Sequence, residues 1–409
     1  QGTETGCGIE PTAGAVVIII EVPGINGLCG IPDHDRLRND VTQRIQQKRL
    51  CLHLRADFIE RLLPGLIRAV GAGAVVHARL DCRIQLVQHT VRVTLDRQFA
   101  RMAGKLVFAD VDAETGLMTS ETFEAARATA MGSVKAVYPV HINGQTANIA
   151  AIRQVAGDMP IVEDACHALG GVHKAANGEW VPVGSCAYSE MSIFSFHPVK
   201  TVAMGEGGAV TTNDDHLAER LRRHRNIGMN RNPETIENAG QAFDTSGEIN
   251  PWYYEMPELG LNYRASAVHC ALGLNQLGKL ERFVGIRNRL VERYAEALAP
   301  LAAVVRMLPK SADCEAAWHL CVVLIDFDAA GTDRAQVMKA LAARNIGTQV
   351  HYLPVNRQPY YQRLYGETTL PGADAYYEKI LSLPLQVSMT DEDVEYVAAM
   401  LGEVLGGGG

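Results

Sequence analysis

Hydrophobic and polar positions change their period repeatedly from about residue 101 to the C-terminus. Short apolar runs, typical of strands, alternate with stretches in which apolar side chains recur every three or four residues, as in amphipathic helices. This alternation predicts an α/β fold in which helices cover both faces of a mainly parallel sheet, and such sheets bind ligands at the carboxyl ends of their strands. The expected strands are 105–111, 134–140, 160–163 and 191–196, and the expected helices are 120–131, 148–156 and 214–225.

The pattern also divides this part of the chain. Apolar residues at helical spacing predict a long helix from about 265 to 298, and a smaller α/β unit follows it. In that unit we expect strands over 318–327 and 347–352, a helix over 332–344, and a last helix opened by a capping box at Thr390 and Asp393. We therefore predict a large domain over 101–265, a linking helix over 266–300, a small C-terminal domain over 301–405 and a glycine tail over 406–409.

The first hundred residues differ from the rest. They hold one lysine, Lys48, and no tyrosine or tryptophan, whereas all 13 tyrosines lie from Tyr138 onward. Helix and strand periods are hard to separate there, so residues 1–100 are interpreted as an atypical N-terminal block. The apolar run 13–20 is far shorter than the roughly 20 residues of a membrane-spanning helix, and the first basic residue, Arg36, comes too late for the basic region of a secretory signal.

Composition excludes several classes of function. With 46 acidic and 38 basic residues, the net charge is −8, and no run of lysine or arginine is available to neutralise a nucleic-acid backbone. The nine cysteines are odd in number and include no C-x-x-C pair, which favours reduced thiols in a cytoplasm over a disulfide framework or a zinc site. No H-E-x-x-H or G-x-G-x-x-G motif is present, so we expect no metal and no dinucleotide as partners. The charge balance and the short apolar run likewise predict no nucleic acid and no membrane as partners.

Candidate chemistry begins in the segment Ile193-Phe194-Ser195-Phe196-His197-Pro198-Val199-Lys200. Apolar residues lead out of a strand into a turn that ends in lysine, and Gly205-Glu206-Gly207-Gly208 follows. Glycines let the backbone approach a ligand closely, and partial desolvation lowers an amine's pKa, which makes it a nucleophile able to form a Schiff base. The alternative is an ordinary surface lysine in a loop.

A second candidate is the buried-type strand that ends in Glu163-Asp164 and is followed by His167. An aspartate at the carboxyl end of a strand can hold a ring nitrogen protonated, and a histidine three residues later can contact the same ring. Alternatively, Asp164 caps the next segment and His167 is a hydrogen-bonded core imidazole. The two candidates together favour one shared site.

These motifs resemble the DegT/DnrJ/EryC1/StrS family of pyridoxal-phosphate-dependent sugar aminotransferases. The resemblance runs from about 101 to 405 and is closest to the branch that aminates a UDP-4-keto-6-deoxy sugar on the route to pseudaminic acid. It implies a three-layer fold of type I, pyridoxal 5'-phosphate as cofactor, and L-glutamate as amino donor. The motifs that carry it are EDACHALG at 163–170, SFHPVKTVAMGEGGAVTTND at 195–214, PWYYEMPELGLNYRASAVHCALG at 251–273 and GTQVHYLPVNRQPYY at 347–361.

The resemblance also implies roles for individual residues. Lys200 corresponds to the Schiff-base lysine, Asp164 to the partner of the pyridine nitrogen and His167 to a ring contact. Ser195 corresponds to a donor to the cofactor phosphate. The remaining correspondences are Asn262, which would reach the phosphate of a neighbouring subunit in a homodimer with a shared active site, and His351 and Tyr352, which would line the sugar-nucleotide site.

The N-terminal block departs from the family pattern. A hydroxyl-bearing phosphate cradle and a ring-stacking aromatic are expected there. The nearest glycine-rich segment, Gly71-Ala72-Gly73-Ala74, lacks the hydroxyl side chain, and Thr90-Val91-Arg92-Val93 stands where the aromatic residue is expected. We therefore hypothesise that this block has been replaced or read in another frame. Two alternatives to the predicted activity follow: a transaminase for another keto nucleotide sugar, or a non-catalytic binding protein.

Overall fold

The computed structural model describes residues 16–20, 106–130 and 132–406. All described residues except Leu106 belong to one compact unit of the chain. The segments 71–74 and 90–93 of the sequence analysis lie outside the described residues.

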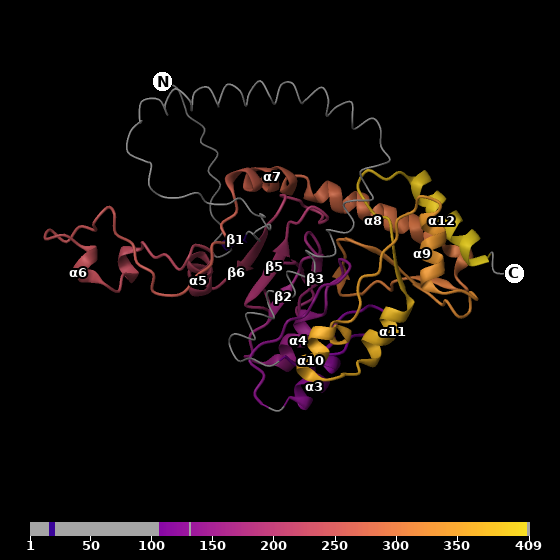
Figure 1. Cartoon of the computed structure of the whole chain (residues 1–409), viewed down its shortest axis with the longest axis horizontal. Coiled ribbons are helices and arrows are strands. Elements are labelled where there is room, and N and C mark those ends of the chain that lie inside the picture. Colours follow the sequence, from indigo (N-terminus) through magenta and orange to yellow (C-terminus); the bar gives the residue numbers. More distant parts are fainter. Residues whose placement is uncertain (1–15, 21–105, 131, 407–409) are drawn as a thin grey trace, which may run out of the picture. The chain divides into compact units, whose positions relative to one another are not determined.

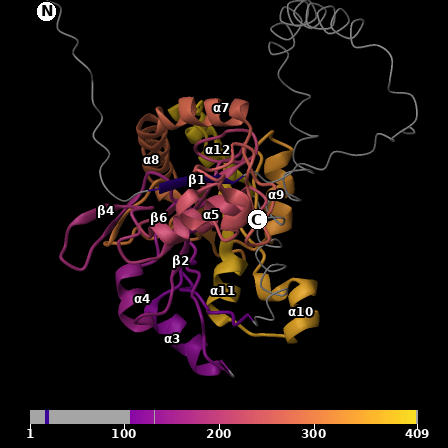
Figure 2. The same cartoon turned by 90° about the vertical axis from the view of Figure 1, so that its left-hand side faces the viewer.

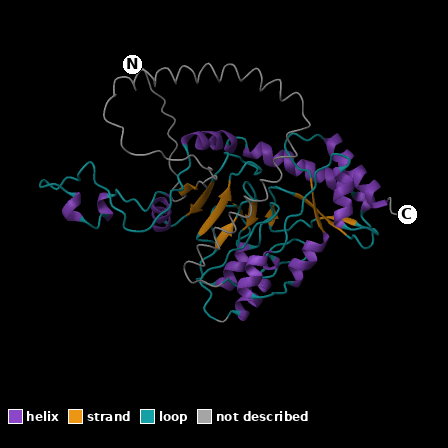
Figure 3. Cartoon of the chain, viewed as in Figure 1, coloured by secondary structure: helices purple, strands orange, loops and turns teal. Residues whose placement is uncertain are grey.

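A mixed sheet forms the centre of this unit (Figure 3). Its strand order is β1 (Val16–Ile20), β6 (Gly208–Thr212), β5 (Met191–Ser195) and β2 (Val162–Asp164). The strands β2 and β5 run parallel, whereas β6 is antiparallel to both β5 and β1. Two further parallel bridges, Val137 to Ile161 and Val140 to Asp164, extend the parallel part beyond β2. An antiparallel edge on a parallel sheet is common in α/β folds.

The helices α3 (Ser120–Thr129) and α4 (Ile149–Ala156) lie side by side next to β2 (Figure 2). Both begin where the sequence supplies a capping side chain, Thr119 for α3 and Asn148 for α4. Their apolar faces meet the sheet in one buried cluster, which comprises Phe123, Val137, Ala147, Ile149, Ile152, Ala156 and Ile161.

The segment after β6 begins with α5 (Asp215–Arg225) and continues through η1 (Pro233–Thr235) and α6 (Ala239–Ala242) to α7 (Ala267–Leu277) and α8 (Leu280–Ala297). Figure 1 shows α7 and α8 following one another along the unit. The sequence predicted one helix here, but Gly278 and Lys279 separate two. Glycine at Gly278 lowers helix propensity, but Gly273 and Gly285 lie inside the two helices, so propensity alone does not set the place of the interruption.

A second buried cluster joins α8, α9 (Arg334–Ala342) and α12 (Asp391–Gly406) to a three-stranded antiparallel sheet. That sheet has the order β10 (Ile380–Leu383), β9 (Cys321–Ile325) and β7 (Val305–Met307). All five residues of β9 are buried, as expected for a central strand covered on both faces. The remaining elements are β3 (Val172–Lys174), β4 (Trp180–Pro182), β8 (Cys314–Glu315), η2 (Ala299–Leu301), η3 (Val355–Arg357), α10 (Pro359–Tyr365) and α11 (Pro371–Lys379).

Several predicted strands are shorter than expected or absent. Residues 106–111 form no strand, 134–140 contribute only two bridges, and 347–352 contribute one bridge from Gln349 to Ser382. The strand predicted over 318–327 is limited to β9. Apolar character alone does not make a ladder, because each strand also needs a partner in register. Within the described ranges, no helix is long and apolar enough to cross a bilayer.

Candidate active site at the ends of strands β2 and β5

Two polar side chains end neighbouring parallel strands. Asp164 is the last residue of β2 and Ser195 the last residue of β5, and Asp164 pairs with Ile193 across the two strands. Asp164 and Ser195 therefore lie at the same edge of the sheet, as the sequence predicted. Asp164 Oδ1 accepts a hydrogen bond from the Cys166 N–H (3.1 Å), and Ser195 Oγ accepts from the His197 N–H (3.4 Å). These contacts fix the first turn beyond each strand.

Lys200 lies in the loop that follows β5, and backbone hydrogen bonds close the base of this loop. The Phe196 N–H donates to the Gly207 carbonyl (2.9 Å), and the Phe196 carbonyl accepts from the Met204 N–H (2.8 Å). Inside the loop, the Lys200 N–H donates to the His197 carbonyl (2.8 Å). The Lys200 side chain is half-buried. The loop is thus an ordered turn anchored at the end of β5, and its backbone places Lys200 just beyond the strand that neighbours β2.

The charge of Lys200 acts on two histidines. Burial together with the Lys200 charge lowers the pKa of His197. Burial also holds the pKa of His319 well below its ordinary value, with further lowering by Lys200, Arg287 and His351. Since charge effects of this kind need proximity, they group Lys200 with both imidazoles.

His167 lies between the backbone of Asn143 and the side chain of Tyr352. Its Nδ1 accepts a hydrogen bond from the Asn143 N–H (3.3 Å), and its Nε2 is 3.4 Å from the Tyr352 hydroxyl. His351 is held separately, through a 2.7 Å contact between its Nδ1 and Ser382 Oγ. The 347–352 segment therefore reaches the site through Tyr352, although it forms no strand.

Asn262 is not brought to the other predicted residues. It is exposed and forms an isolated antiparallel bridge with Asn226, after α5. Over the described part of the chain, no hydrogen bond or ring contact joins it to Asp164, His167 or Lys200. Within one subunit it is therefore not part of the site.

Sequence reasoning missed residues that support the site from behind. His141 and Glu163 form a buried pair with Nε2 and Oε2 2.8 Å apart, and His319 packs its ring on that of His167. Asn143 is fully buried and has a left-handed backbone, with a φ of 65°. An Asn-Gly pair is a recognisable turn signal, so the sequence Asn143-Gly144 was the available clue to this conformation.

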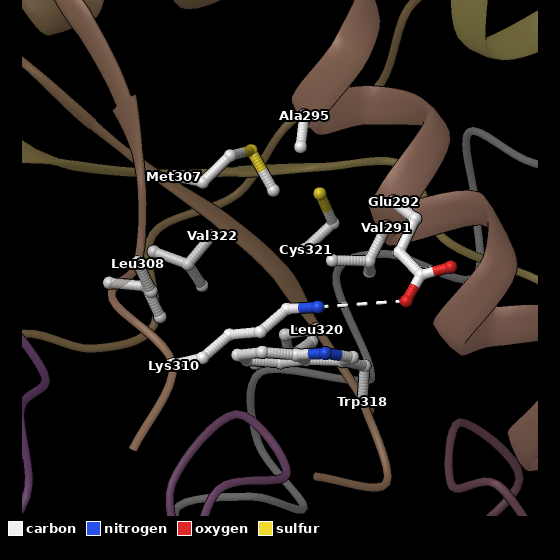
Figure 4. Close-up of a pocket in the computed structure, with 10 residues that line it drawn as sticks. All are labelled: Val291, Glu292, Ala295, Met307, Leu308, Lys310, Trp318, Leu320, Cys321 and Val322. Carbon is white, nitrogen blue, oxygen red and sulfur yellow. Dashed lines mark ion pairs between the residues drawn. The ribbon is translucent and has the colours of Figure 1, made fainter. Parts of the chain in front are cut away.

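A separate cavity lies among α8, β7 and β9 and has a volume of about 130 Å³ (Figure 4). Its lining is mainly apolar, and an ion pair between Lys310 Nζ and Glu292 Oε1 (3.6 Å) borders it. Pockets for drug-sized ligands span roughly 300–1,000 Å³, so this cavity is too small for a nucleotide sugar. The described residues also contain no cluster of three or more histidine, cysteine, aspartate or glutamate side chains suited to a metal ion.

Comparison with known proteins identifies relatives in sequence and in fold. The chain is 35% identical to the spore coat polysaccharide biosynthesis protein SpsC of Bacillus subtilis over 306 residues, 74% of either protein. DesI, solved in the presence of its TDP-sugar product, matches with a TM-score of 0.62 and 27% identity over 76% of this chain and 72% of that one. Helicobacter pylori PseC, an aminotransferase involved in the biosynthesis of pseudoaminic acid, matches with a TM-score of 0.65 over 76% of each chain; at 24% identity it shows the shared fold alone.

The family comparison covers most of the chain. Residues 96–402 match the DegT/DnrJ/EryC1/StrS aminotransferases, and this range contains the strand ends and the loop described above. The match begins close to the point at which the sequence recovers regular helix and strand periods. The α/β fold is that of type I pyridoxal-phosphate-dependent sugar aminotransferases, and the chain belongs to the DegT/DnrJ/EryC1/StrS aminotransferase family.

Proposed function

We propose that this protein uses pyridoxal 5'-phosphate to transfer an amino group from L-glutamate to the 4-keto group of a 4-keto-6-deoxy UDP-sugar. The observation that carries this proposal is the placement of Lys200 beyond β5, at the sheet edge where the neighbouring parallel strand β2 ends in Asp164. The motifs shared with the pseudaminic acid branch support the choice of sugar. The likeness to SpsC supports a role in polysaccharide biosynthesis more generally.

The residues at this edge fit the cofactor. An amine, a carboxylate, an imidazole and a hydroxyl come from Lys200, Asp164, His167 and Ser195, which is the donor set needed for an aldehyde, a ring nitrogen and a phosphate. Gly208, which pairs with Ser195, carries no side chain, and a Cβ atom there would meet the Phe194 carbonyl oxygen at 2.4 Å; the glycine therefore lets β6 lie close to β5 at the strand end that carries Ser195. When bound, the cofactor supplies an electron sink for the carbon that loses its proton.

Each residue then has a separate task. Lys200 would hold the cofactor through its amine and, when free, would move the proton at the reacting carbon. Asp164 would keep the ring nitrogen protonated through its negative charge. Ser195 would donate a hydrogen bond from its hydroxyl to the phosphate, and His167 would contact the ring. His351 and Tyr352 line the place of the sugar nucleotide.

A second copy of the chain completes the site in this proposal. The 11 residues of α7 include none that is buried, and Val268 and Leu274 are 78% and 73% exposed. The preceding segment, which leaves the sheet at α5 (Figure 1), exposes Trp252 by 72% and Leu259 by 82%. Apolar surface of this extent marks an interaction site, and a homodimer covers it while carrying Asn262 to the partner's cofactor phosphate.

The test is covalent trapping. We expect the purified protein, incubated with pyridoxal phosphate and reduced with borohydride, to carry the cofactor on Lys200 in peptide mapping, and Lys200→Ala to carry none. A protein that takes up no cofactor would instead be the non-catalytic binding protein.

Location in the cytoplasm remains a prediction.

A different keto nucleotide sugar is the second candidate substrate. The observation that favours it is the likeness to DesI, which was solved with a TDP-sugar. Steady-state assays with UDP- and TDP-linked keto sugars, each with L-glutamate, distinguish the two. A kcat/KM higher for the TDP-linked sugar would reject the UDP-sugar proposal while leaving the transaminase assignment in place.

A further inference from the structure

His319 faces the candidate active site, whereas the residues before and after it face a separate cavity. Trp318 and Leu320 line the apolar cavity of Figure 4, whereas His319, between them, does not. The His319 ring lies instead against that of His167, with the centroids 4.5 Å apart and the planes at 50°. Its exposed fraction is 5%, so the imidazole is enclosed by protein.

One residue connects the two histidines through its backbone. The Asn143 N–H donates to His167 Nδ1 (3.3 Å), and the Asn143 carbonyl accepts from the N–H groups of His319 (2.9 Å) and Leu320 (3.2 Å). Because Asn143 is fully buried, water does not compete for these bonds. The backbone of His319 and the ring of His167 are therefore both fixed to the backbone of one residue, Asn143.

This arrangement selects one tautomer of His167. A neutral imidazole that accepts at Nδ1 carries its proton on Nε2. That proton points to the Tyr352 hydroxyl, 3.4 Å away. The ring of His319, tilted by 50° to that of His167, packs on it and opposes rotation of the His167 ring out of its plane.

The surroundings of His319 keep it neutral. Burial is the main cause of its low pKa, and Lys200, Arg287 and His351 add positive charge nearby. Its Nδ1 is buried without a hydrogen-bond partner in the described part of the chain. The ring therefore acts on its neighbours by contact, and its nitrogen takes no part in a described network.

We propose that His319 is a positioning residue: its ring holds the imidazole of His167, and through it the cofactor ring that His167 contacts. This inference rests on the proposed function for the identity of the ring. His319 itself touches neither the reacting atoms nor the cofactor in this proposal. The ring contact between His319 and His167 and their shared hydrogen bonds to the Asn143 backbone carry this inference.

The experiment compares His319→Leu, which removes the ring, with His319→Phe, which keeps one. The control is His173→Leu, because His173 is 4% exposed but lies in β3 against Tyr188. Three quantities are measured on the full-length protein: circular dichroism of the bound cofactor, which reports ring orientation, its dissociation constant, and kcat and KM. Thermal unfolding without cofactor accompanies each.

We expect His319→Leu to lose at least half of the cofactor dichroism. We also expect it to lower kcat by about 10- to 100-fold and to change KM less, because a small misplacement of the reacting groups has effects of this size. His319→Phe is expected to restore both within about 3-fold, and His173→Leu to leave both unchanged. Unchanged dichroism in His319→Leu, or equal losses in the Leu and Phe variants, would overturn the inference. If the wild-type protein binds no cofactor, the proposed function fails instead, and the two failures are distinguishable.

Discussion

The imidazole of His141 donates from Nε2 to the carboxylate of Glu163, 2.8 Å away, one residue before Asp164. The tautomer follows from the Ala147 N–H, which donates to His141 Nδ1 (3.1 Å). Ser192 also donates to Glu163 (2.9 Å), and the His141 N–H donates to the Asp164 carbonyl (3.0 Å). The pair thus ties residues 137–141 to β2 and β5, and it stiffens the sheet edge that carries Asp164.

Replacing Glu163 by glutamine tests the charge of this pair. Burial alone would raise the pKa of Glu163, but hydrogen bonds from His141, Ser189 and Ser192 lower it overall. A carboxyl whose pKa is lowered on folding stabilises the protein above its unfolded pKa of about 4.5 and loses that contribution as pH falls through the folded pKa. We expect Glu163→Gln to reduce the free energy of unfolding by about 1–3 kcal/mol at pH 7.5, measured by urea denaturation, and by less below pH 5.

A matched control separates the buried pair from a surface charge. Glu124 is 57% exposed and pairs with Arg127 at 3.9 Å. Because exposed pairs contribute little, Glu124→Gln should change the free energy of unfolding by less than about 0.5 kcal/mol. Equal effects of the two substitutions, or a Glu163→Gln effect independent of pH, would contradict a stabilising role for the buried carboxylate.

Gly144 permits the close approach of the segment that carries His319. Its φ is 111°, and a Cβ atom there would lie 2.2 Å from the Ala317 carbonyl oxygen. We expect Gly144→Ala to lower the free energy of unfolding by more than about 2 kcal/mol, since backbone must move as well as adopt a strained conformation. Gly178 has a φ of 87° but open space around it, so Gly178→Ala should cost only about 1 kcal/mol. Thermal and urea unfolding of both variants measure the difference.

Local sequence signals predicted the parts of the site that follow strand ends. Asp164 and Ser195 each end a buried strand, and the turn after Ser195 carries Lys200. At each of these two strand ends, the change from apolar to polar residues pointed to the position. The helix start at Thr390 was equally local: Thr390 Oγ1 accepts from the Asp393 N–H (3.3 Å), and the Thr390 N–H donates to Asp393 Oδ2 (2.8 Å). This capping box is confirmed. In each case the determining residues are within a few positions of one another.

Contacts between distant segments were not predictable in this way. His319 is 152 positions from His167, in a run that reads as an apolar strand, and nothing local distinguishes it from a core histidine. The segment 347–352 has strand character but finds only one bridge, from Gln349 to Ser382. Pairing depends on which segment folding brings alongside, and that is set by the whole topology rather than by composition. The predicted domain boundaries stay predictions.

The proposed role of Asp164 predicts that removing its charge lowers activity strongly without preventing cofactor binding. Asp164→Asn keeps the size and the hydrogen bond to the Cys166 N–H but removes the charge that, in the proposed function, holds the ring nitrogen protonated. We expect kcat to fall by at least about 100-fold, as when one electrostatic stabiliser is removed from an active site, while borohydride still traps the cofactor on Lys200. The exposed Asp158 provides the control, and Asp158→Asn should leave kcat unchanged. Wild-type kcat in Asp164→Asn would reject this role.

A shared active site predicts complementation between two inactive variants. If Lys200 of one subunit works with Asn262 of the other, then Lys200→Ala and Asn262→Ala each disable both sites of their own homodimers. A hybrid of the two has one site with both substitutions and one with neither. We expect the hybrid, purified through different tags on its two chains, to recover about half of the wild-type activity per dimer.

The same experiment tests the exposed surface of α7. Leu274 is 73% exposed, and Leu274→Asp in both chains should give monomers in sedimentation and abolish the recovery, because a carboxylate cannot be buried in an apolar interface without a partner. Leu364, in α10, is 53% exposed, and Leu364→Asp should leave both the dimer and the recovery intact. A stable hybrid dimer without recovered activity would show that Asn262 does not act across the interface. In that case its exposed position after α5 would be structural, and the site would be complete within one subunit.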